Sequence, residues 1–160
     1  MDLVSVEKLA KKLISEHLGQ YGWEFKWSNA KKTFGTCSYK RNFLGISEGG
    51  VITLSRPLCL LNDENQVTDT ILHEIAHGLT KGDGHGLKWK RACIKIGAKP
   101  ERCFSSKNVL LPEMKYTAIC GGCSKKFNQN RITVNIRSAC ICQNTKKWDE
   151  KLVLKFVKNY

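Results

Sequence analysis

The segment His73-Glu74-Ile75-Ala76-His77 constrains this chain more than any other part of its 160 residues. Residues four apart on an α-helix share a face, so the two imidazoles can bind one metal ion together. Glu74, one position along, can reach a water molecule on that ion. Two histidines, a third ligand and an open position are typical of a catalytic zinc site rather than a structural one. We therefore expect a hydrolytic zinc site on this helix.

The flanking sequence predicts a helix from about residue 63 to residue 79. Asn62 or Asp63 can cap its start, and Gln66 stands where a capping-box partner of Asp63 belongs. The segment before the helix, Pro57–Leu61, is expected to be a connection. Apolar residues recur at helical spacing and can bury one face. They are Val67, Ile71, Leu72, Ile75, Ala76 and Leu79.

The third ligand is expected to be His85, which opens the next amphipathic run. Imidazole suits zinc well, and helical geometry would hold the ring in place. Asp83 is the closest alternative, and Glu101 or Glu113 could act as the downstream glutamate of other zincins. Seven residues separate His77 from His85, two more than in the metzincin pattern, so the sequence does not fit that class.

Side chains around the metal are expected to supply the rest of the chemistry. Zinc held by neutral imidazoles lowers the pKa of its water to about 7 and polarises a carbonyl group. Glu74 would take the proton of that water and pass it to the leaving amine, which is peptide hydrolysis. Trp89 lies four residues past His85 on the same helical face, so we expect it to pack beside that ligand. The sequence does not identify the group that stabilises the oxyanion, although Tyr39 and Tyr116 are candidates.

The rest of the chain predicts an α+β fold. Helical spacing of apolar residues predicts a first helix over 4–18 and another over about 86–96. Alternation and short apolar runs predict three strands, at 23–27, 33–39 and 51–55. In zincins, a sheet edge above the metal receives the substrate as an added strand. One of these strands is therefore expected to bind an extended peptide, and the sequence leaves open which one.

The length of the chain suits one compact domain with a small appendage. We expect the first domain to cover residues 1–112 and a basic β subdomain to cover residues 113–160, in a monomeric protein. Residues 98–115, which include Pro100 and Pro112, have the composition of the linker between them.

The chain has eight cysteines and no apolar secretory segment at its start, so we expect a reducing, cytoplasmic setting. Metal binding then explains close cysteine pairs better than disulfides do. Cys120 and Cys123 form one pair, and Cys140 and Cys142 form another, with 16 residues between the pairs. This pattern predicts a zinc ribbon with four cysteine ligands. The second pair departs from the usual C-x-x-C spacing, so a ribbon without metal stays an alternative.

The excess basic charge lies entirely in the second half of the sequence. Residues 1–80 contain 9 Lys and Arg against 9 Asp and Glu, whereas residues 81–160 contain 18 against 5, which gives the net charge of +13. This asymmetry favours DNA as a partner, with a solvated basic face as the alternative. Without a hydrophobic span or lipidation motif, a membrane is disfavoured. The expected nucleic-acid contacts are Lys125, Lys126, Arg131, Arg137, Lys146 and Lys147.

Four segments, in this order, resemble the SprT-like zinc metalloproteases, the family that includes Spartan. They are Phe34–Cys37, the strand Ile52–Ser55, the motif His73–His77 and the run His85–Trp89. The resemblance implies a zincin-like protease domain followed by a small zinc-binding subdomain. It also implies that the three histidines bind zinc and that Glu74 is the base. Spartan-type members cleave proteins bound or crosslinked to DNA, so the resemblance implies protein substrates of that kind.

The sequence therefore favours a zinc endopeptidase that acts on protein bound to DNA. A zinc-stabilised nucleic-acid-binding adaptor without catalysis is one alternative, and a zinc peptidase with no DNA role is the other. Glu74 favours an enzyme, because a structural site needs no carboxylate beside an open coordination position.

Overall fold

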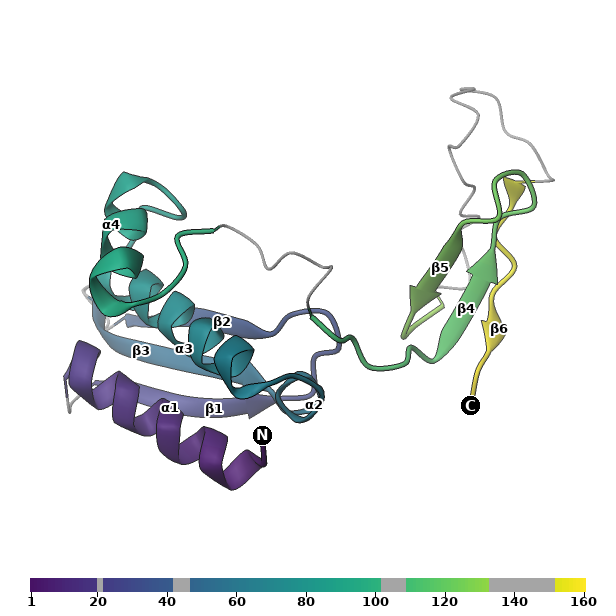
Figure 1. Cartoon of the computed structure of the whole chain (residues 1–160). Helices are drawn as coiled ribbons and strands as arrows, with labels where there is room; N and C mark the ends of the chain where they lie inside the picture. The colour runs from purple at the N-terminus through teal and green to yellow at the C-terminus, as the bar shows by residue number, and fades with distance from the viewer. Residues whose placement is uncertain (20–21, 42–46, 102–108, 133–151) are drawn as a thin grey trace. The chain divides into compact units, whose positions relative to one another are not determined.

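The computed structural model describes residues 1–19, 22–41, 47–101, 109–132 and 152–160 (Figure 1). The chain divides into two compact units, Met1–Pro112 and Glu113–Tyr160. Helices and small sheets are both present, so the fold is α+β, as the sequence predicts. None of the helices in the described ranges combines the length and the apolar surface that crossing a bilayer needs.

The first unit contains the predicted helices and strands together with one helix that was not predicted. The sequence predicted a connection over 57–61, but a short helix lies there. The Ser55 side chain accepts the backbone N–H of Leu58, and Pro57 lies in the first turn, where its missing N–H costs nothing. The elements in chain order are α1 (Leu3–Leu18), β1 (Trp23–Ser28), β2 (Gly35–Arg41), β3 (Ser47–Ser55), α2 (Arg56–Leu61), α3 (Glu64–Leu79) and α4 (Leu87–Ile96).

Strand β3 is longer than the predicted strand at 51–55, since it begins at Ser47. Gly49 has a φ of 94°, in the left-handed region that favours glycine. The N–H of Gly50 donates to the backbone oxygen of Gly22 at 2.8 Å, and a Cβ at Gly49 would collide with the backbone of Gly22. Gly49 and Gly50 thus permit the backbone of β3 to approach the backbone of Gly22 closely.

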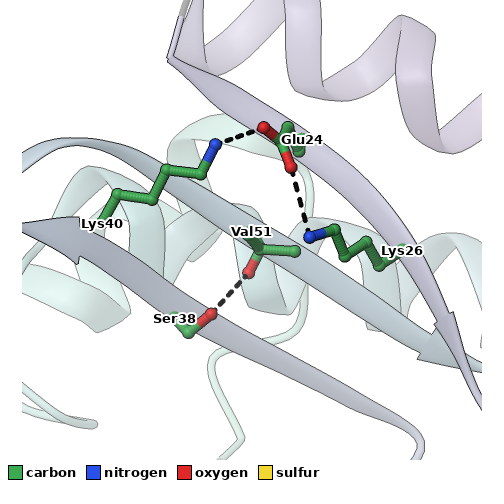
Figure 2. Close-up of polar contacts among 5 residues, drawn as sticks. All are labelled: Glu24, Lys26, Ser38, Lys40 and Val51. Atoms are coloured by element: carbon green, nitrogen blue, oxygen red, sulfur yellow. Dashed lines mark hydrogen bonds and ion pairs between the residues drawn. The ribbon is translucent and has the colours of Figure 1, made fainter.

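The strands of the first unit form a sheet with the order β1-β3-β2. Strand β1 runs parallel to β3, and β2 runs antiparallel to it, so β1 and β2 are the two edges. Helices α1 and α3 pack against each other and against the sheet. On the face of the sheet that these helices do not cover, Lys26 and Lys40 both form ion pairs with Glu24 (Figure 2). The core includes Val6, Ala10, Ile14, Phe34, Ile52, Leu54, Leu58, Val67, Ile71, Ile75 and Trp89.

Helix α3 carries the histidine motif and is fixed at both ends. At its start, the predicted capping box is present: Asp63 accepts the N–H of Gln66 at 2.8 Å, and Gln66 accepts the N–H of Asp63 at 3.2 Å. Near its end, a Cβ at Gly78 would lie 2.9 Å from Leu18 and 3.0 Å from Trp23. A larger residue at Gly78 would therefore displace the side chains of Leu18 and Trp23.

The second unit is a small antiparallel sheet with the order β5-β4-β6. Its strands are β4 (Tyr116–Ile119), β5 (Lys126–Gln129) and β6 (Val157–Lys158). Cys120 and Leu152 are buried, and Phe127 and Leu154 pack against them. A core of this size is small, so a domain of this kind gains much from a bound metal.

The capping box predicts a measurable contribution to stability. Replacing Asp63 with alanine removes the acceptor for the Gln66 N–H, so the free energy of unfolding of the first unit should fall by about 1 kcal/mol. Urea denaturation followed by circular dichroism measures this change. Asn65→Ala, an exposed position in the same turn, is the matched control and should leave stability unchanged or slightly higher. Equal losses for the two variants would contradict the role of the cap.

Candidate metal centre

The structure brings the three predicted histidine ligands together. His73 and His77 lie on α3, and His85 lies just before α4. The Nε2 atom of His85 is 3.1 Å from Nε2 of His77 and 3.3 Å from Nε2 of His73. Two nitrogen ligands of one tetrahedral zinc ion lie about 3.3 Å apart, given Zn–N bonds of about 2.0–2.1 Å. The spacing and the chemistry of these three nitrogens therefore fit zinc.

The alternative third ligands lie elsewhere or have another role. Asp83 accepts the backbone N–H of Trp89 at 2.9 Å and so caps the first turn of α4. Glu101 is not part of the cluster of metal-binding groups found among the described residues, which contains the three histidines alone. Glu113 belongs to the second unit. His85 is thus the group that the fold places beside the two helical imidazoles.

A tight loop between α3 and α4 brings His85 to this position. The N–H of Asp83 donates to the carbonyl of Thr80 at 3.1 Å, and the N–H of Gly86 donates to the carbonyl of Asp83 at 3.0 Å. Gly82 and Gly84 have φ values of 83° and 57°, which other residues adopt at a cost. The loop therefore reverses the chain within a few residues.

Trp89 packs against all three imidazoles. Its side chain is completely buried, and its ring centroid lies 4.8 Å from that of His73 and 4.6 Å from that of His85. It stacks on His77 with centroids 5.4 Å apart and an interplanar angle of 28°. The predicted contact with His85 is therefore confirmed, and it extends to the other two rings. A rigid aromatic surface of this kind holds ligand rings in one orientation.

Burial keeps His73 and His77 in the neutral form that binds metal. Desolvation, together with the neighbouring His77 and His85, lowers the pKa of His73 to about 4. Desolvation and His85 also lower the pKa of His77. Neutral imidazoles bind metal without first losing a proton, so the site is ready to bind metal at neutral pH.

Glu74 lies beside this cluster with its carboxylate held by strand β2. The side chain is 7 % exposed, and desolvation raises its pKa to about 7, against the lowering effect of a hydrogen bond from the Cys37 backbone. A Cβ at Gly35 would lie 2.8 Å from Cγ and 2.9 Å from Oε1 of Glu74. The β2 backbone thus passes directly against the carboxylate. Sequence reasoning missed this role of Gly35, for which glycine inside a strand is the available signal.

The metal centre opens into a cleft of about 630 Å³ between β2 on one side and α3 with its following loop on the other. Burial, with a smaller effect from Glu74, raises the pKa of the Cys37 thiol to about 12, so this lining group stays neutral. The cleft is lined by Gly35, Thr36, Cys37, Tyr39, His73, Glu74, His77, Thr80, Gly82, Gly84 and His85.

The two tyrosines suggested for the oxyanion have different positions. The hydroxyl of Tyr39 lines the cleft but donates a hydrogen bond to the backbone carbonyl of His77. This bond holds the last turn of α3, so Tyr39 positions a ligand residue. Tyr116 lies on β4 in the second unit.

The first predicted cysteine pair lies in the turn between β4 and β5. The N–H of Gly122 donates to Sγ of Cys120 at 3.4 Å, and the N–H of Ser124 donates to the carbonyl of Cys120 at 2.9 Å. Ser124 has a φ of 57°, and Cys123 is exposed next to it. The other predicted pair, Cys140 and Cys142, lies outside the described residues.

Three of the six predicted nucleic-acid contacts lie within the described residues, and three do not. Lys125, Lys126 and Arg131 are exposed, and Lys125 lies 5.6 Å from the ring centroid of Phe127. Arg137, Lys146 and Lys147 lie outside the described residues.

The site combines a helix that carries two imidazoles and a buried carboxylate with a third imidazole and an adjacent edge strand. This arrangement is typical of metallopeptidases. The SprT-like family model matches residues 6–110, and the chain belongs to the SprT-like family. The match confirms the resemblance predicted from the sequence. The matched residues include all helices and strands of the first unit, except for the first three residues of α1.

The crystal structure of the metallopeptidase zymogen of Pyrococcus abyssi abylysin is similar to this chain at 20 % identity, with a TM-score of 0.42, over 64 % of this chain and 83 % of that one. No curated protein is significantly similar in sequence.

The geometry predicts different effects at His85 and Asp83. His85→Ala should abolish tight zinc binding at this site, because it removes one of three ligands. Asp83→Asn should change the zinc affinity less than about tenfold, because an amide oxygen still accepts the Trp89 N–H, whereas Asp83→Ala should weaken it about 10- to 100-fold. Competition with a chromogenic chelator measures these affinities. An Asp83→Asn variant as defective as His85→Ala would identify Asp83 as a ligand.

Proposed function

We propose that this protein is a zinc-dependent endopeptidase that cleaves proteins bound or crosslinked to DNA. The observation that carries the peptidase proposal is the buried carboxylate of Glu74 in the same open cleft as three convergent imidazoles. A structural zinc site would be closed by a fourth protein ligand and would need no carboxylate beside it. Membership of the SprT-like family supports the same chemistry.

Glu74 is proposed as the general base. A zinc ion on the three imidazoles would supply a Lewis acid that activates water and polarises the scissile carbonyl. The hydrogen bond from Cys37 and the contact with Gly35 fix the direction of the carboxylate. A carboxylate with a pKa near neutrality can accept a proton and return it to a leaving amine. A bound cation would lower that pKa by stabilising the ionised form.

Strand β2 is proposed as the strand that receives the substrate. Both β1 and β2 are edges of the sheet, but β2 is the one that lines the cleft. The carbonyl of Phe34 accepts the N–H of Ser55 at the β3 side, whereas the N–H of Cys37 points to Glu74. Because these directions alternate along a strand, the backbone groups of Gly35 and Tyr39 also face away from β3. An extended peptide can pair with them and lay its backbone across the metal centre.

DNA is proposed as the partner that brings substrates to the cleft. The second unit contains 10 Lys and Arg against 3 Asp and Glu, a net charge of +7. Lys125 and Lys126 are exposed beside the partly buried ring of Phe127, an arrangement that suits phosphate contact and base stacking. A protein held on that DNA would be at high local concentration near the peptidase.

Catalysis and DNA dependence can be tested together. A DNA-binding protein is incubated with the zinc-loaded chain, with and without DNA, and cleavage is followed by gel electrophoresis. We expect wild-type protein to cleave faster with DNA and Glu74→Gln to be slower by about 10²- to 10⁴-fold while it still binds zinc. Glu64→Gln, an exposed glutamate on the same helix, is the matched control and should cleave as the wild type does.

The outcomes separate the three functions. No cleavage under any condition would leave the non-catalytic adaptor. Equal cleavage with and without DNA would favour a peptidase with no DNA role. Full activity in Glu74→Gln would remove this residue as the base.

A second, structural zinc site is proposed in the second unit. The backbone N–H that donates to Sγ of Cys120 is typical of a thiolate ligand in a metal-binding turn, and Cys123 follows three residues later. Cys140 and Cys142 would complete the ligand set.

Metal analysis tests the count of sites. We expect elemental mass spectrometry of the acid-digested protein to give two zinc ions per wild-type chain. The double variant Cys120→Ser/Cys123→Ser should retain one ion, and His73→Ala/His77→Ala should also retain one, because each pair of changes removes two ligands of a different site. A wild-type chain with one ion, unaffected by the cysteine changes, would contradict the structural site.

A further inference from the structure

Part of the basic charge belongs to the first unit, although a division of the sequence into halves assigns all of it to the second half. The first unit contains 17 Lys and Arg against 11 Asp and Glu, a net charge of +6, although residues 1–80 are neutral. Its whole excess therefore lies between residue 81 and residue 112. Within the peptidase unit, the described part of that excess is concentrated on α4 and its two flanks. These residues are Lys81, Lys88, Lys90, Arg91, Lys95 and Lys99.

Helix α4 presents a row of cations on the side that faces solvent. Trp89 and Cys93 are completely buried and mark its inner face. Lys88, Arg91 and Lys95 are exposed, and their spacing of three and four residues aligns them along the helix. At a rise of about 1.5 Å per residue, this row is about 10 Å long. We call these three residues the α4 row.

The α4 row has no acidic partner among the described residues, whereas four lysines elsewhere in the first unit form ion pairs. On α1, Lys11 forms an ion pair with Glu7 at 2.6 Å. On the open face of the sheet, two lysines share the carboxylate of Glu24 (Figure 2).

Two carboxylates that contact α4 or the residues just after it are engaged by backbone groups. Asp83 accepts the N–H of Trp89 at 2.9 Å, and Asp69 accepts the N–H of Lys99 at 2.9 Å. Helix α4 itself contains no acidic residue. No described carboxylate forms an ion pair with the row, so its positive charge is available to a polyanion.

We propose that the α4 row binds the phosphate backbone of DNA and so holds DNA on the unit that contains the metal centre. Each strand of DNA carries one phosphate per about 3.4 Å of helix axis, so a row of about 10 Å laid along the duplex spans about three phosphates of one strand. His85 lies two residues before α4, which places this contact and a metal ligand on adjoining positions of one unit. This inference rests on the proposed function and adds a DNA contact within the peptidase unit.

The α4 row gives the proposed peptidase a means of choosing substrates. DNA bound through the second unit would raise the local concentration of an attached protein near the peptidase. DNA bound along α4 would bring a protein attached to that DNA to the cleft entrance, where β2 can pair with it. Proteins far from DNA would lack this advantage.

The test compares two triple variants with the same change in net charge. Lys88→Gln/Arg91→Gln/Lys95→Gln removes the α4 row, and Lys8→Gln/Lys11→Gln/Lys12→Gln removes three exposed lysines from α1 as the matched control. The full, zinc-loaded chain binds a fluorescein-labelled DNA duplex, and anisotropy gives the Kd between about 50 and 200 mM salt. Thermal unfolding establishes that both variants are folded.

We expect the α4 variant to bind DNA about ten- to a hundredfold more weakly and its salt dependence, the slope of log K against log salt, to fall by roughly 2.7. The α1 variant should keep the wild-type slope. Equal effects of the two variants, or an unchanged α4 variant, would overturn the proposal. A second arm measures binding to vesicles that contain anionic phospholipid. If the α4 variant lost vesicle binding but kept DNA binding, that result would overturn the proposal in favour of a membrane surface. Binding is measured without cleavage, so an inactive wild type would end only the proposed peptidase function.

Discussion

The structure depends on one geometric requirement, that three imidazole nitrogens converge around a single point, with His85 Nε2 3.1 and 3.3 Å from the other two. Helical spacing brings the first two together without help from the rest of the fold. His85 reaches them because the chain turns back sharply after α3 and because Asp83 fixes the first turn of α4. Trp89 then packs against all three rings, so one buried side chain sets their orientation and lowers their exposure to water.

A second requirement concerns the carboxylate. A buried glutamate is costly unless its surroundings hold it, and here the strand β2 supplies both a backbone hydrogen bond and a close backbone approach at Gly35. The same strand is an edge of the sheet. One element therefore aligns the proposed base and presents an open strand edge, so the proposed catalysis and substrate binding would share their geometry.

Local patterns in the sequence predicted much of the first unit. The capping box at Asp63, the helix of the motif and the short strands follow from side-chain chemistry and hydrophobic period, which act over a few residues. The helix at 56–61 was missed because Pro57 suggests a break unless Ser55 is recognised as its cap. A division of the sequence at residue 80 also conceals the positive charge of the first unit, because it separates α4 from the helix it packs against.

The sequence by itself determined that two imidazoles and a carboxylate share one helix, because a helix repeats its faces every 3.6 residues whatever surrounds it. It also determined the candidates for the third ligand and the family resemblance. Only the tertiary structure decided among those candidates, placed Gly35 against Glu74 and made β2 the edge beside the cleft. These contacts join residues that are far apart in the chain, so they depend on how the loop, the strand and the helices pack together rather than on any local pattern.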